Sequence, residues 1–577
     1  MEYKGEVMYF KVLIVVSALA IPSSAAQQPP QPQTAGATTG VPTMADAQAR
    51  MAASDFAGAA KLLEAITVHT PGNPRAWQML GTAYLRSKEA DRAIVAFGKV
   101  LELQPQSWQA VYNMGVAHAL KKDSTQAFEW LAKARASHQI DMSQIDQDAN
   151  LTALRTDPRF ARLRPTEADF ANTFVEPVAI VREWRGESAN DQFGWIARNL
   201  GDVDGDRLGE VVTSAPTKAV GGASAGRIYV YSSGTSSLLW TADGQPGDQL
   251  GLGVESAGDT NKDGTPDVIA SAPGGGYAKV YSGNDGRVLL TLRAEDRADT
   301  FGRHVAGAGD VDRDGYEDVI VGAPGNDAGG DGAGRAYVYS GKDGRVLLTL
   351  TGERAQDSFG SAVAGYAKGT SMLLLVGAPG AGPSRRGRTY VYDSLTPKPK
   401  FVIEADETGA ALGAMFLSVP GDVDGDGVAD AYASDFSNSA KGPSTGRTVV
   451  HSGKDGRPLL TLTGETAGEG FGTSPSVAGD VDGDGHADLI VGAWQYAGAA
   501  IGGGRAYLYS GKDGKLLKTY TCRTPGDTFG FDAVTLGDID ADGMDDLLIT
   551  SAWSGVRGFH SGRIFVISSG ISKGPAK

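Results

Sequence analysis

The fold is decided by the stretch FGRHVAGAGDVDRDGYEDVIVGAP, residues 301–324, which predicts a strand, an acidic loop and a second, largely apolar strand. After a Gly-rich connection, GRAYVYS (334–340) alternates with a period of two, as a third strand does. The Asp-Gly of the next turn, SGKDG, supplies the positive φ that a tight hairpin needs, and RVLLTLTGE (345–353) follows as a fourth strand. The stretch therefore opens a unit of four strands.

The unit recurs along the chain. The SGKDG turn returns at 452–456 and 510–514, and as SGNDG at 282–286. A Phe-Gly or Leu-Gly pair marks each copy at a spacing of roughly 50–60 residues, the size of a four-stranded propeller blade. These pairs are Phe193-Gly194, Leu250-Gly251, Phe301-Gly302, Phe359-Gly360, Leu412-Gly413, Phe471-Gly472 and Phe529-Gly530. The repeats predict an all-β, seven-bladed β-propeller over residues 178–570.

The two ends of the array predict how the ring closes. The last unit stops after GRIFVISSG (562–570), a third strand, so it lacks a fourth. Before the first Phe-Gly pair lies AIVREWRGE (179–187), which aligns with the fourth strands of the other units. We expect this N-terminal strand to complete the last blade, because closure hides two sheet edges that would otherwise be exposed.

These repeats resemble the FG-GAP repeats of the integrin α-subunit head. VGAP itself stands at 321–324 and 376–379, whereas the sixth and seventh units depart with GAW at 492–494 and SAW at 551–553. The resemblance covers about residues 178–570 and implies a propeller of the integrin-α type. It also implies metal loops on the lower face of the ring and ligands on the upper face.

Six of the seven units contain an acidic loop of the form D-x-[DN]-x-D-x-x-x-[DE]. Oxygen ligands at alternate positions of a tight loop suit a hard cation, and a backbone carbonyl at position seven can add a further ligand. The predicted ligands are Asp202, Asp204, Asp206, Leu208 and Glu210; Asp259, Asn261, Asp263, Thr265 and Asp267; Asp310, Asp312, Asp314, Tyr316 and Asp318; Asp422, Asp424, Asp426, Val428 and Asp430; Asp480, Asp482, Asp484, His486 and Asp488; and Asp538, Asp540, Asp542, Met544 and Asp546.

The ligand types favour Ca²⁺, with about six structural ions. The loops offer neither Cys nor a His side chain at a ligand position, which argues against zinc or copper, and Mg²⁺ prefers fewer protein ligands. Without cations the clustered carboxylates would repel one another; the alternative for a single loop is an acidic, solvated turn. Arg207 replaces the glycine found at position six of the other loops, so the first site is the least regular. The fourth unit lacks the motif, and we expect it to be metal-free.

A small all-α domain of helical repeats is predicted before the propeller, over residues 44–165. One 34-residue unit carries Trp77, Leu80, Gly81, Tyr84, Ala93, Phe97 and Pro105, which match the tetratricopeptide pattern. Three units are expected near 40–73, 74–107 and 108–141, followed by a capping helix from Asp148. Gly81 would let two helices approach closely beside the small Ala93, and Pro105 would end the second helix. The alternative is a generic pair of helical hairpins. Such arrays bind a peptide or protein in a concave groove.

The N-terminus predicts export. Lys4 and Lys11 precede a short apolar run over 12–21, and small residues follow near Ala26, as in a signal peptide over 1–26. An uncleaved anchor and a start at Met8 are the alternatives. Residues 27–43 are rich in Gln, Pro, Thr and Ala and predict a flexible linker, and 571–577 form a C-terminal tail. The expected location is secreted, periplasmic or extracellular, with no transmembrane segment.

Composition narrows the possible partners. The net charge of −15 disfavours a nucleic-acid partner, and a single cysteine, Cys522, excludes an intramolecular disulfide framework. An exported chain of 577 residues without disulfides needs another means of stabilisation, for which metal ions are suited.

Two functional classes remain. The first is a calcium-dependent binding or adhesion module for a protein or glycan ligand, with no enzymatic activity. Aromatic and polar residues that depart from the repeat give a candidate ligand surface on the upper face: Trp195, Trp494, Tyr496, Trp553 and Arg557. The alternative role of these aromatics is to seal gaps between blades. The second class is an extracytoplasmic hydrolase or lyase that uses the upper face, which would need non-repeating His, Asp, Glu or Arg residues clustered there.

Overall fold

The computed structural model describes residues 42–369, 371–474 and 477–572. The predicted signal peptide, all but the last two residues of the predicted linker, and residues 573–577 of the predicted tail lie outside these ranges. Between Pro165 and Thr166 the chain divides into two compact units, each described by itself below. Nowhere in the described ranges is there a helix with the length and apolar character needed to span a bilayer.

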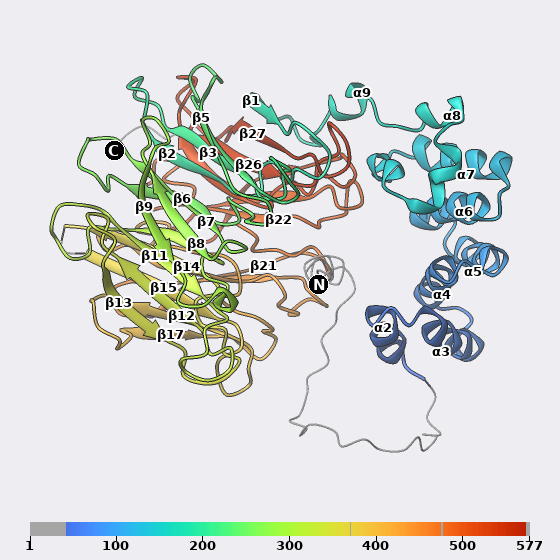
Figure 1. Cartoon of the computed structure of the whole chain (residues 1–577), viewed down its shortest axis with the longest axis horizontal. Helices are drawn as coiled ribbons and strands as arrows, with labels where there is room; N and C mark the ends of the chain where they lie inside the picture. Colours follow the sequence, from blue (N-terminus) through green and yellow to red (C-terminus); the bar gives the residue numbers. More distant parts are fainter. Residues whose placement is uncertain (1–41, 370, 475–476, 573–577) are drawn as a thin grey trace. The chain divides into compact units, whose positions relative to one another are not determined.

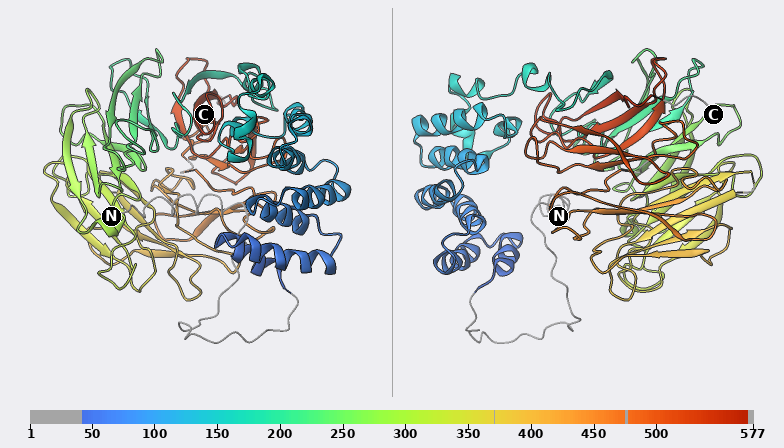
Figure 2. Two further views of the ribbon diagram at one scale, coloured as in Figure 1. Left: turned by 45° about the vertical axis from the view of Figure 1, so that its right-hand side comes forward. Right: turned by 180° about the vertical axis from the view of Figure 1, so that it is seen from behind.

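The first unit is an array of helical hairpins (Figure 2). Asp55, Asn73 and Asp123 cap three of the helices, because each side chain accepts a hydrogen bond from the first turn. The helices of the three hairpins are α2 (Met44–Ala52) with α3 (Phe56–His69), α4 (Pro74–Arg86) with α5 (Ala90–Leu103), and α6 (Trp108–Leu120) with α7 (Ser124–Ala136). The three predicted repeats are confirmed.

Glycine is needed inside two of these hairpins. A Cβ on Gly81 would collide with the ring of Phe97, and a Cβ on Gly115 would collide with Leu131. The close approach predicted at Gly81 is therefore real, but the partner that faces it is Phe97. Helix α5 ends at Leu103, just before Pro105, as expected.

The predicted single capping helix is wrong. Beyond the 3₁₀ turn η1 (Met142–Asp146), the segment forms a second 3₁₀ turn, η2 (Ala149–Leu154), and a single helical turn, α8 (Pro158–Ala161). The reason is that Asp148 and Asp157 each cap a new start, and the proline after Asp157 cannot continue a preceding helix. Leu151 and Phe160 still close the helical core, since both are fully buried.

The second unit is a propeller of seven sheets (Figure 1), numbered here as blades one to seven. In blades one to six the strands pair in sequence order, and the first strands of blades one to five and of blade seven contact those of neighbouring blades. Blades one to three are β2 (Ala197–Gly201), β3 (Glu210–Ala215), β4 (Arg227–Tyr231), β5 (Leu238–Asp243); β6 (Val254–Gly258), β7 (Asp267–Ala272), β8 (Tyr277–Tyr281), β9 (Val288–Arg293); and β10 (Val305–Gly309), β11 (Asp318–Ala323), β12 (Arg335–Tyr339), β13 (Val346–Thr351).

Blades four and five continue the pattern, blade six has three strands among the described residues, corresponding to the second to fourth strands of the other blades, and blade seven takes its fourth strand from the N-terminal end of the propeller. They are β14 (Val363–Lys368), β15 (Ser371–Ala378), β16 (Arg388–Tyr392), β17 (Phe401–Glu404); β18 (Leu417–Ser418), β19 (Ala431–Asp435), β20 (Arg447–His451), β21 (Pro458–Thr463); β22 (Leu489–Ala493), β23 (Arg505–Tyr509), β24 (Leu516–Thr521); and β25 (Ala533–Gly537), β26 (Asp546–Ser551), β27 (Arg563–Ser568) with β1 (Ile180–Arg185).

The Phe-Gly pairs join neighbouring blades. The glycine of each pair has a φ between +78° and +103°, a region open to glycine and strained for other residues. In blade one, Phe193 bridges to Gly562 of blade seven, while its ring packs on Tyr229 of its own blade with the centroids 5.3 Å apart. The pair therefore fixes one blade against the preceding one.

Ring closure by the N-terminal strand is confirmed. Strand β1 pairs antiparallel with β27, from Ile180 opposite Ile567 to Arg185 opposite Arg563, and Figure 1 shows the two side by side. In blade four the acidic loop is replaced by a hairpin, in which Lys368 pairs with Ser371.

Residues 166–179 also belong to the propeller, which the sequence did not predict. After the helical turn α9 (Glu167–Phe170), Phe174 forms a bridge with Cys522, and the Val175 amide donates to the Thr521 carbonyl at 2.9 Å. The Glu176 carboxylate accepts from the Thr521 amide at 2.7 Å. We call residues 166–185 the closing segment, because they lie first against β24 of blade six and then, as β1, complete blade seven.

Candidate metal centres and aromatic cluster

Five of the six acidic loops gather carboxylates closely enough to share one cation. In each of these loops one oxygen per residue lies within 4.8 Å of the others. The groups are Asp202, Asp204, Asp206 and Glu210; Asp310, Asp312 and Asp318; Asp422, Asp424 and Asp430; Asp480, Asp482 and Asp488; and Asp538, Asp540 and Asp542. The predicted ligands Asp314, Asp426, Asp484 and Asp546 belong to the same loops but lie outside these closest groups.

The loop of blade two differs from the others. Asn261 stands at position three, and the structure does not gather Asp259, Asp263 and Asp267 as tightly as the carboxylates of the five groups above. The Asp263 amide nevertheless donates to Asn261 Oδ1 at 2.9 Å, so the turn itself is formed.

Backbone amides shape each loop around its first carboxylate. In blade three, the amides of Asp314 and Gly315 donate to the two oxygens of Asp310 at 3.0 and 2.9 Å. The Val311 amide donates to Asp318 Oδ2 at 2.9 Å, so the loop closes on its position-nine carboxylate. Carboxylate oxygens are thereby held on one side of a tight turn, as hard cations require.

The position-nine carboxylates show the electrostatic cost of this arrangement. All six are fully buried, and burial raises the pKa of Asp318 to about 6 and the pKa values of Glu210, Asp488 and Asp546 to about 7. Neighbouring carboxylates of the same loop act in the same direction. A divalent cation would remove this penalty, so the donor set fits Ca²⁺.

Basic residues of the hairpin turns, which the sequence reasoning missed, face the acidic loops. Lys342, Lys454 and Lys512 lie 3.4–3.6 Å from the position-five carboxylate of their own blade. Arg345 and Arg457 pair with the position-three carboxylates Asp312 and Asp424 at 2.6 and 2.5 Å. The sequence alone could have indicated these pairs, because the lysine of each SGKDG turn follows the acidic loop of its blade at a constant sequence separation. In blade two, where position three is Asn261, Asn284 replaces this lysine.

The non-repeating aromatics form one cluster across three blades. Trp553 packs on Trp494 and Trp195, with ring centroids 4.9 and 5.6 Å apart, and Phe531 contacts all three. Trp195 and Trp553 are only 6% and 5% exposed, so they present little surface to a ligand. Trp195 of blade one and Trp553 of blade seven pack on one another across the boundary between the two blades. Trp494 is partly exposed.

The other two candidate ligand residues lie apart from the cluster. Tyr496 packs under the Arg505 guanidinium, 3.8 Å from its ring centroid. Arg557 is exposed, and its backbone amide donates to Ser561 Oγ. The structure therefore joins Trp195, Trp494 and Trp553, and shows no ring contact between these three and Tyr496 or Arg557 among the described residues.

Non-repeating charges also meet at the first strands. Arg198 is buried and pairs with Asp532 of blade seven and, at 2.7 Å, with Glu255 of blade two. Each charge has an opposite partner from an adjacent blade, so the group ties three blades together. His304 lies near this group, and burial lowers the pKa of its imidazole to about 3, which leaves it neutral.

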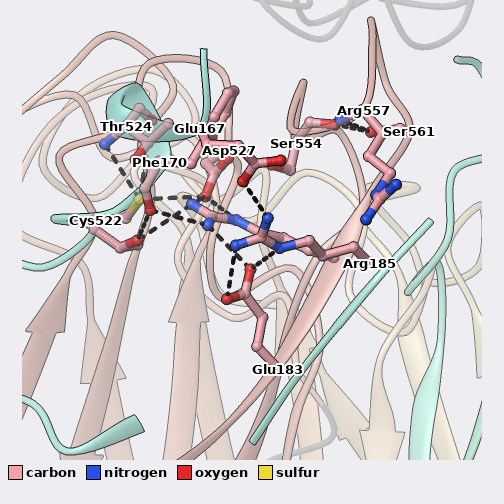
Figure 3. Close-up of polar contacts among 12 residues, drawn as sticks. Glu167, Phe170, Glu183, Arg185, Cys522, Thr524, Asp527, Ser554, Arg557 and Ser561 are labelled. Atoms are coloured by element: carbon pink, nitrogen blue, oxygen red, sulfur yellow. Dashed lines mark hydrogen bonds and ion pairs between the residues drawn. The ribbon is translucent and has the colours of Figure 1, made fainter. Parts of the chain in front are cut away.

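A second buried ion pair holds the closing segment. Arg563, with no exposed surface, donates to Asp527 at 3.0 Å through Nε and lies 3.4 Å from Glu183 of β1. Figure 3 shows this network, in which Arg185 also joins Glu183 and Glu167 at 2.8 and 2.5 Å. Cys522 lies in the same network; its thiol is buried, which raises its pKa and leaves it unreactive.

The same arginine stands at the start of the third strand in five other blades. There its side chain is 16–24% exposed and pairs with a surface carboxylate. At Arg563 the closing segment covers this position, and the Phe170 carbonyl and Thr173 hydroxyl lie 3.5 and 3.4 Å from its guanidinium nitrogens. The arginine that forms a surface ion pair in five blades is therefore buried in blade seven, where it attaches the closing segment.

Comparison with known proteins identifies the repeats. Residues 254–290 and 301–339 match the FG-GAP repeat, 480–549 match the FG-GAP-like repeat, and 50–111 match the tetratricopeptide repeat. Integrin alpha-5 of Xenopus laevis is 28% identical over 218 residues, which is 34% of this chain and 21% of that protein. Integrin alpha pat-2 of Caenorhabditis elegans is 33% identical over 205 residues, 30% of this chain and 16% of that protein.

The alignments thus span about a fifth of these relatives' own length. Together with the seven sheets and the helical hairpins, they assign both parts of the molecule. The chain contains an FG-GAP repeat propeller similar in sequence to integrin alpha chains, preceded by a tetratricopeptide repeat region.

Proposed function

We propose that this protein is an exported, calcium-binding adhesion or binding module without enzymatic activity. The observation that carries the proposal is the convergence of three or four carboxylates in each of five loops, on a propeller similar to integrin alpha chains. The oxygen-only donor sets and the buried position-nine carboxylates support calcium as the ion, with about six ions when the loop of blade two is included.

Calorimetric titration tests the metal. Calcium chloride added to the chelator-treated, full-length protein should bind with a stoichiometry near six, and magnesium chloride should bind more weakly because it requires a stricter octahedral geometry. A chain that takes up no calcium at millimolar concentration would contradict the proposal.

For the ligand, we propose a surface centred on Trp494, which packs on Trp553, with Tyr496 and Arg557 as further candidate contacts and Trp195 behind Trp553. Partly exposed aromatic rings and an exposed arginine suit a carbohydrate or an extended peptide. A glycan and peptide array probed with the wild-type protein, with Trp494→Ala and with Trp553→Ala separates the roles. We expect Trp494→Ala to lose the ligand at an unchanged melting temperature and Trp553→Ala to lower the melting temperature.

For the helical region we propose a protein or peptide partner, because stacked helical hairpins present extended surfaces and contribute no chemistry of their own. A pull-down with residues 42–165 and with the full chain should capture the same partner. A partner retained only by a chain that lacks residues 42–165 would contradict this part of the proposal.

A further inference from the structure

The six acidic loops are not equivalent at their buried carboxylate. In blades two, three, five and six, one oxygen of the position-nine aspartate accepts a hydrogen bond of 2.9–3.1 Å from a glycine amide of the hairpin turn. In blade seven the corresponding atom, Asp546 Oδ1, is buried and has no hydrogen-bond partner in the described protein. In blade one Glu210 Oε1 makes no hydrogen bond of normal geometry, and the Ser233 backbone amide interacts only weakly with this carboxylate. A buried acceptor without a full hydrogen bond can take a cation as its partner.

The predicted ligand carboxylates of the same two loops have no basic counter-ion in the described part of the chain. The turn of blade one is Ser233–Ser236 and has no lysine, and blade seven has no such turn because its fourth strand comes from β1. Among the described residues, no ion pair involves a predicted ligand carboxylate of either loop, in contrast to the lysine and arginine pairs of blades three, five and six. The loop of blade two also has no such pair, but it has one carboxylate fewer because Asn261 stands at position three. Blades one and seven are neighbours in the ring, so two sites with four predicted carboxylate ligands each and no ion pair lie side by side.

The loop of blade seven contacts the start of the closing strand through Ser568. The Ser568 amide donates to the Ala179 carbonyl at 3.0 Å, and its hydroxyl lies 3.5 Å from Asp542 Oδ2. Asp542 and Met544 also line a groove of about 460 Å³ together with Pro177 and Val178 of the closing segment. A shift of the Asp542 carboxylate would therefore be passed to Ala179 of the closing segment through Ser568.

The loop of blade one contacts β1 through the adjacent turn. Arg182 donates to the carbonyls of Ser233 and Gly234 at 3.2 and 3.1 Å, and Trp184 donates to the Ser236 carbonyl at 3.1 Å. This turn lies directly on the acidic loop, since a Cβ on Gly234 would overlap the carboxylate of Asp206. The closing segment therefore contacts the acidic loop of blade seven through Ser568. It also contacts, through Arg182 and Trp184, the turn that lies on the acidic loop of blade one.

We propose that divalent cations bound in the loops of blades one and seven form a clasp that holds the closing segment, whereas the cations of the other loops stabilise only their own blades. The inference rests on the proposed calcium binding. Without the cation, the unpaired carboxylates of these two loops repel one another, and the turn and Ser568 lose their support. The Arg563–Asp527 pair, which involves no cation, keeps the other end of the segment attached.

Hydrogen–deuterium exchange of the full-length protein, with calcium chloride or with a chelator, tests the clasp. We expect chelation to speed exchange of peptides covering 177–185 by about tenfold or more, and to change the fourth strands β13 and β21 much less. Equal acceleration of all fourth strands would overturn the clasp. Calcium binding by calorimetry without any change at 177–185 would overturn it too and leave the proposed calcium binding intact. An absence of calcium binding would overturn both.

A pair of double variants localises the effect. Asp204→Asn with Asp540→Asn removes one exposed ligand from each clasp loop, and Asp312→Asn with Asp424→Asn removes the same position in blades three and five. In calcium, only the first variant should show fast exchange at 177–185. If both variants behave alike, or if only the second accelerates this segment, the loops of blades one and seven have no special role.

Discussion

Arg207 stands at position six of the acidic loop of blade one with a φ of +74°, where the other five loops have glycine at +83° to +92°. A left-handed conformation costs a residue with a Cβ about 1–2 kcal/mol. The side chain itself makes no ion pair with the loop among the described residues. The strain therefore has no visible compensation in side-chain contacts.

Arg207→Gly should increase the free energy of unfolding in calcium by about 1 kcal/mol, because only the backbone strain is relieved. Chemical denaturation followed by tryptophan fluorescence measures the change. Arg207→Ala is the control, since it removes the side chain and keeps the strain; equal stabilisation by alanine and glycine would show that the guanidinium, not the backbone, is responsible.

Arg345 illustrates how a residue outside the loop can tune it. Its guanidinium pairs with Asp312, a predicted calcium ligand, and so competes with the ion for negative charge. Arg345→Met should raise the calcium affinity of that site by about two- to fivefold, as expected for a half-exposed pair. Calorimetry measures it, and the matched control is Arg287→Met, because Arg287 pairs with Asp285 of its own turn instead. A gain in affinity at Arg287→Met of the same size would point to long-range charge alone.

At the scale of elements, β1 decides whether the ring is closed. It buries the edge of β27, which would otherwise expose a row of unpaired amides and carbonyls. The closing segment also pairs with β24, so a single stretch of chain covers the edges of two blades.

Deletion of residues 179–187 should therefore produce aggregation, detected as a shift from monomer to large species by light scattering during gel filtration. Deletion of residues 42–165, which leaves the closing segment in place, should not. A monomeric protein with an unchanged melting temperature after the first deletion would mean that β1 is dispensable for closure.

At the scale of the whole molecule, the two units should respond differently to loss of calcium. An ion present at 100 times its Kd stabilises the folded state by about 2.7 kcal/mol per site. A strong chelator should lower the melting temperature of the propeller by on the order of 10 °C and leave the helical unit unchanged. Differential scanning calorimetry follows the two transitions together, and the circular dichroism signal at 222 nm identifies that of the helices. A chelator that shifts neither transition would exclude calcium as a structural ion.

Much of this molecule could be predicted from its sequence because its determinants are local and repeated. The acidic loops, the Asp-Gly turns and the Phe-Gly pairs each depend on a few neighbouring residues, and seven copies make the period plain. Closure by β1 could be predicted as well, since a missing fourth strand at one end matched a spare strand at the other.

Other features depend on contacts that no local pattern encodes. Arg563 has the same sequence context as the five partly exposed arginines of the other blades, and only the distant closing segment makes it fully buried. The depth of Trp195 and Trp553 is set by how three blades meet at Phe531. The predicted single capping helix does not form because two aspartate caps and a proline interrupt an otherwise helical pattern.

The position of the closing segment has a mechanical consequence. The chain enters the propeller at Thr166, so any tension between the helical repeats and a ligand held by the propeller must pass through residues 166–185. The first contacts to bear that load are those of Phe170 and Thr173 with Arg563, followed by the ladders with β24 and β27, whose bonds share the force in parallel when the strands are pulled along their length. Because the same ladder bears this load and closes the ring, a pull that strips β1 from β27 opens blade seven, while the chain stays covalently continuous into blade one.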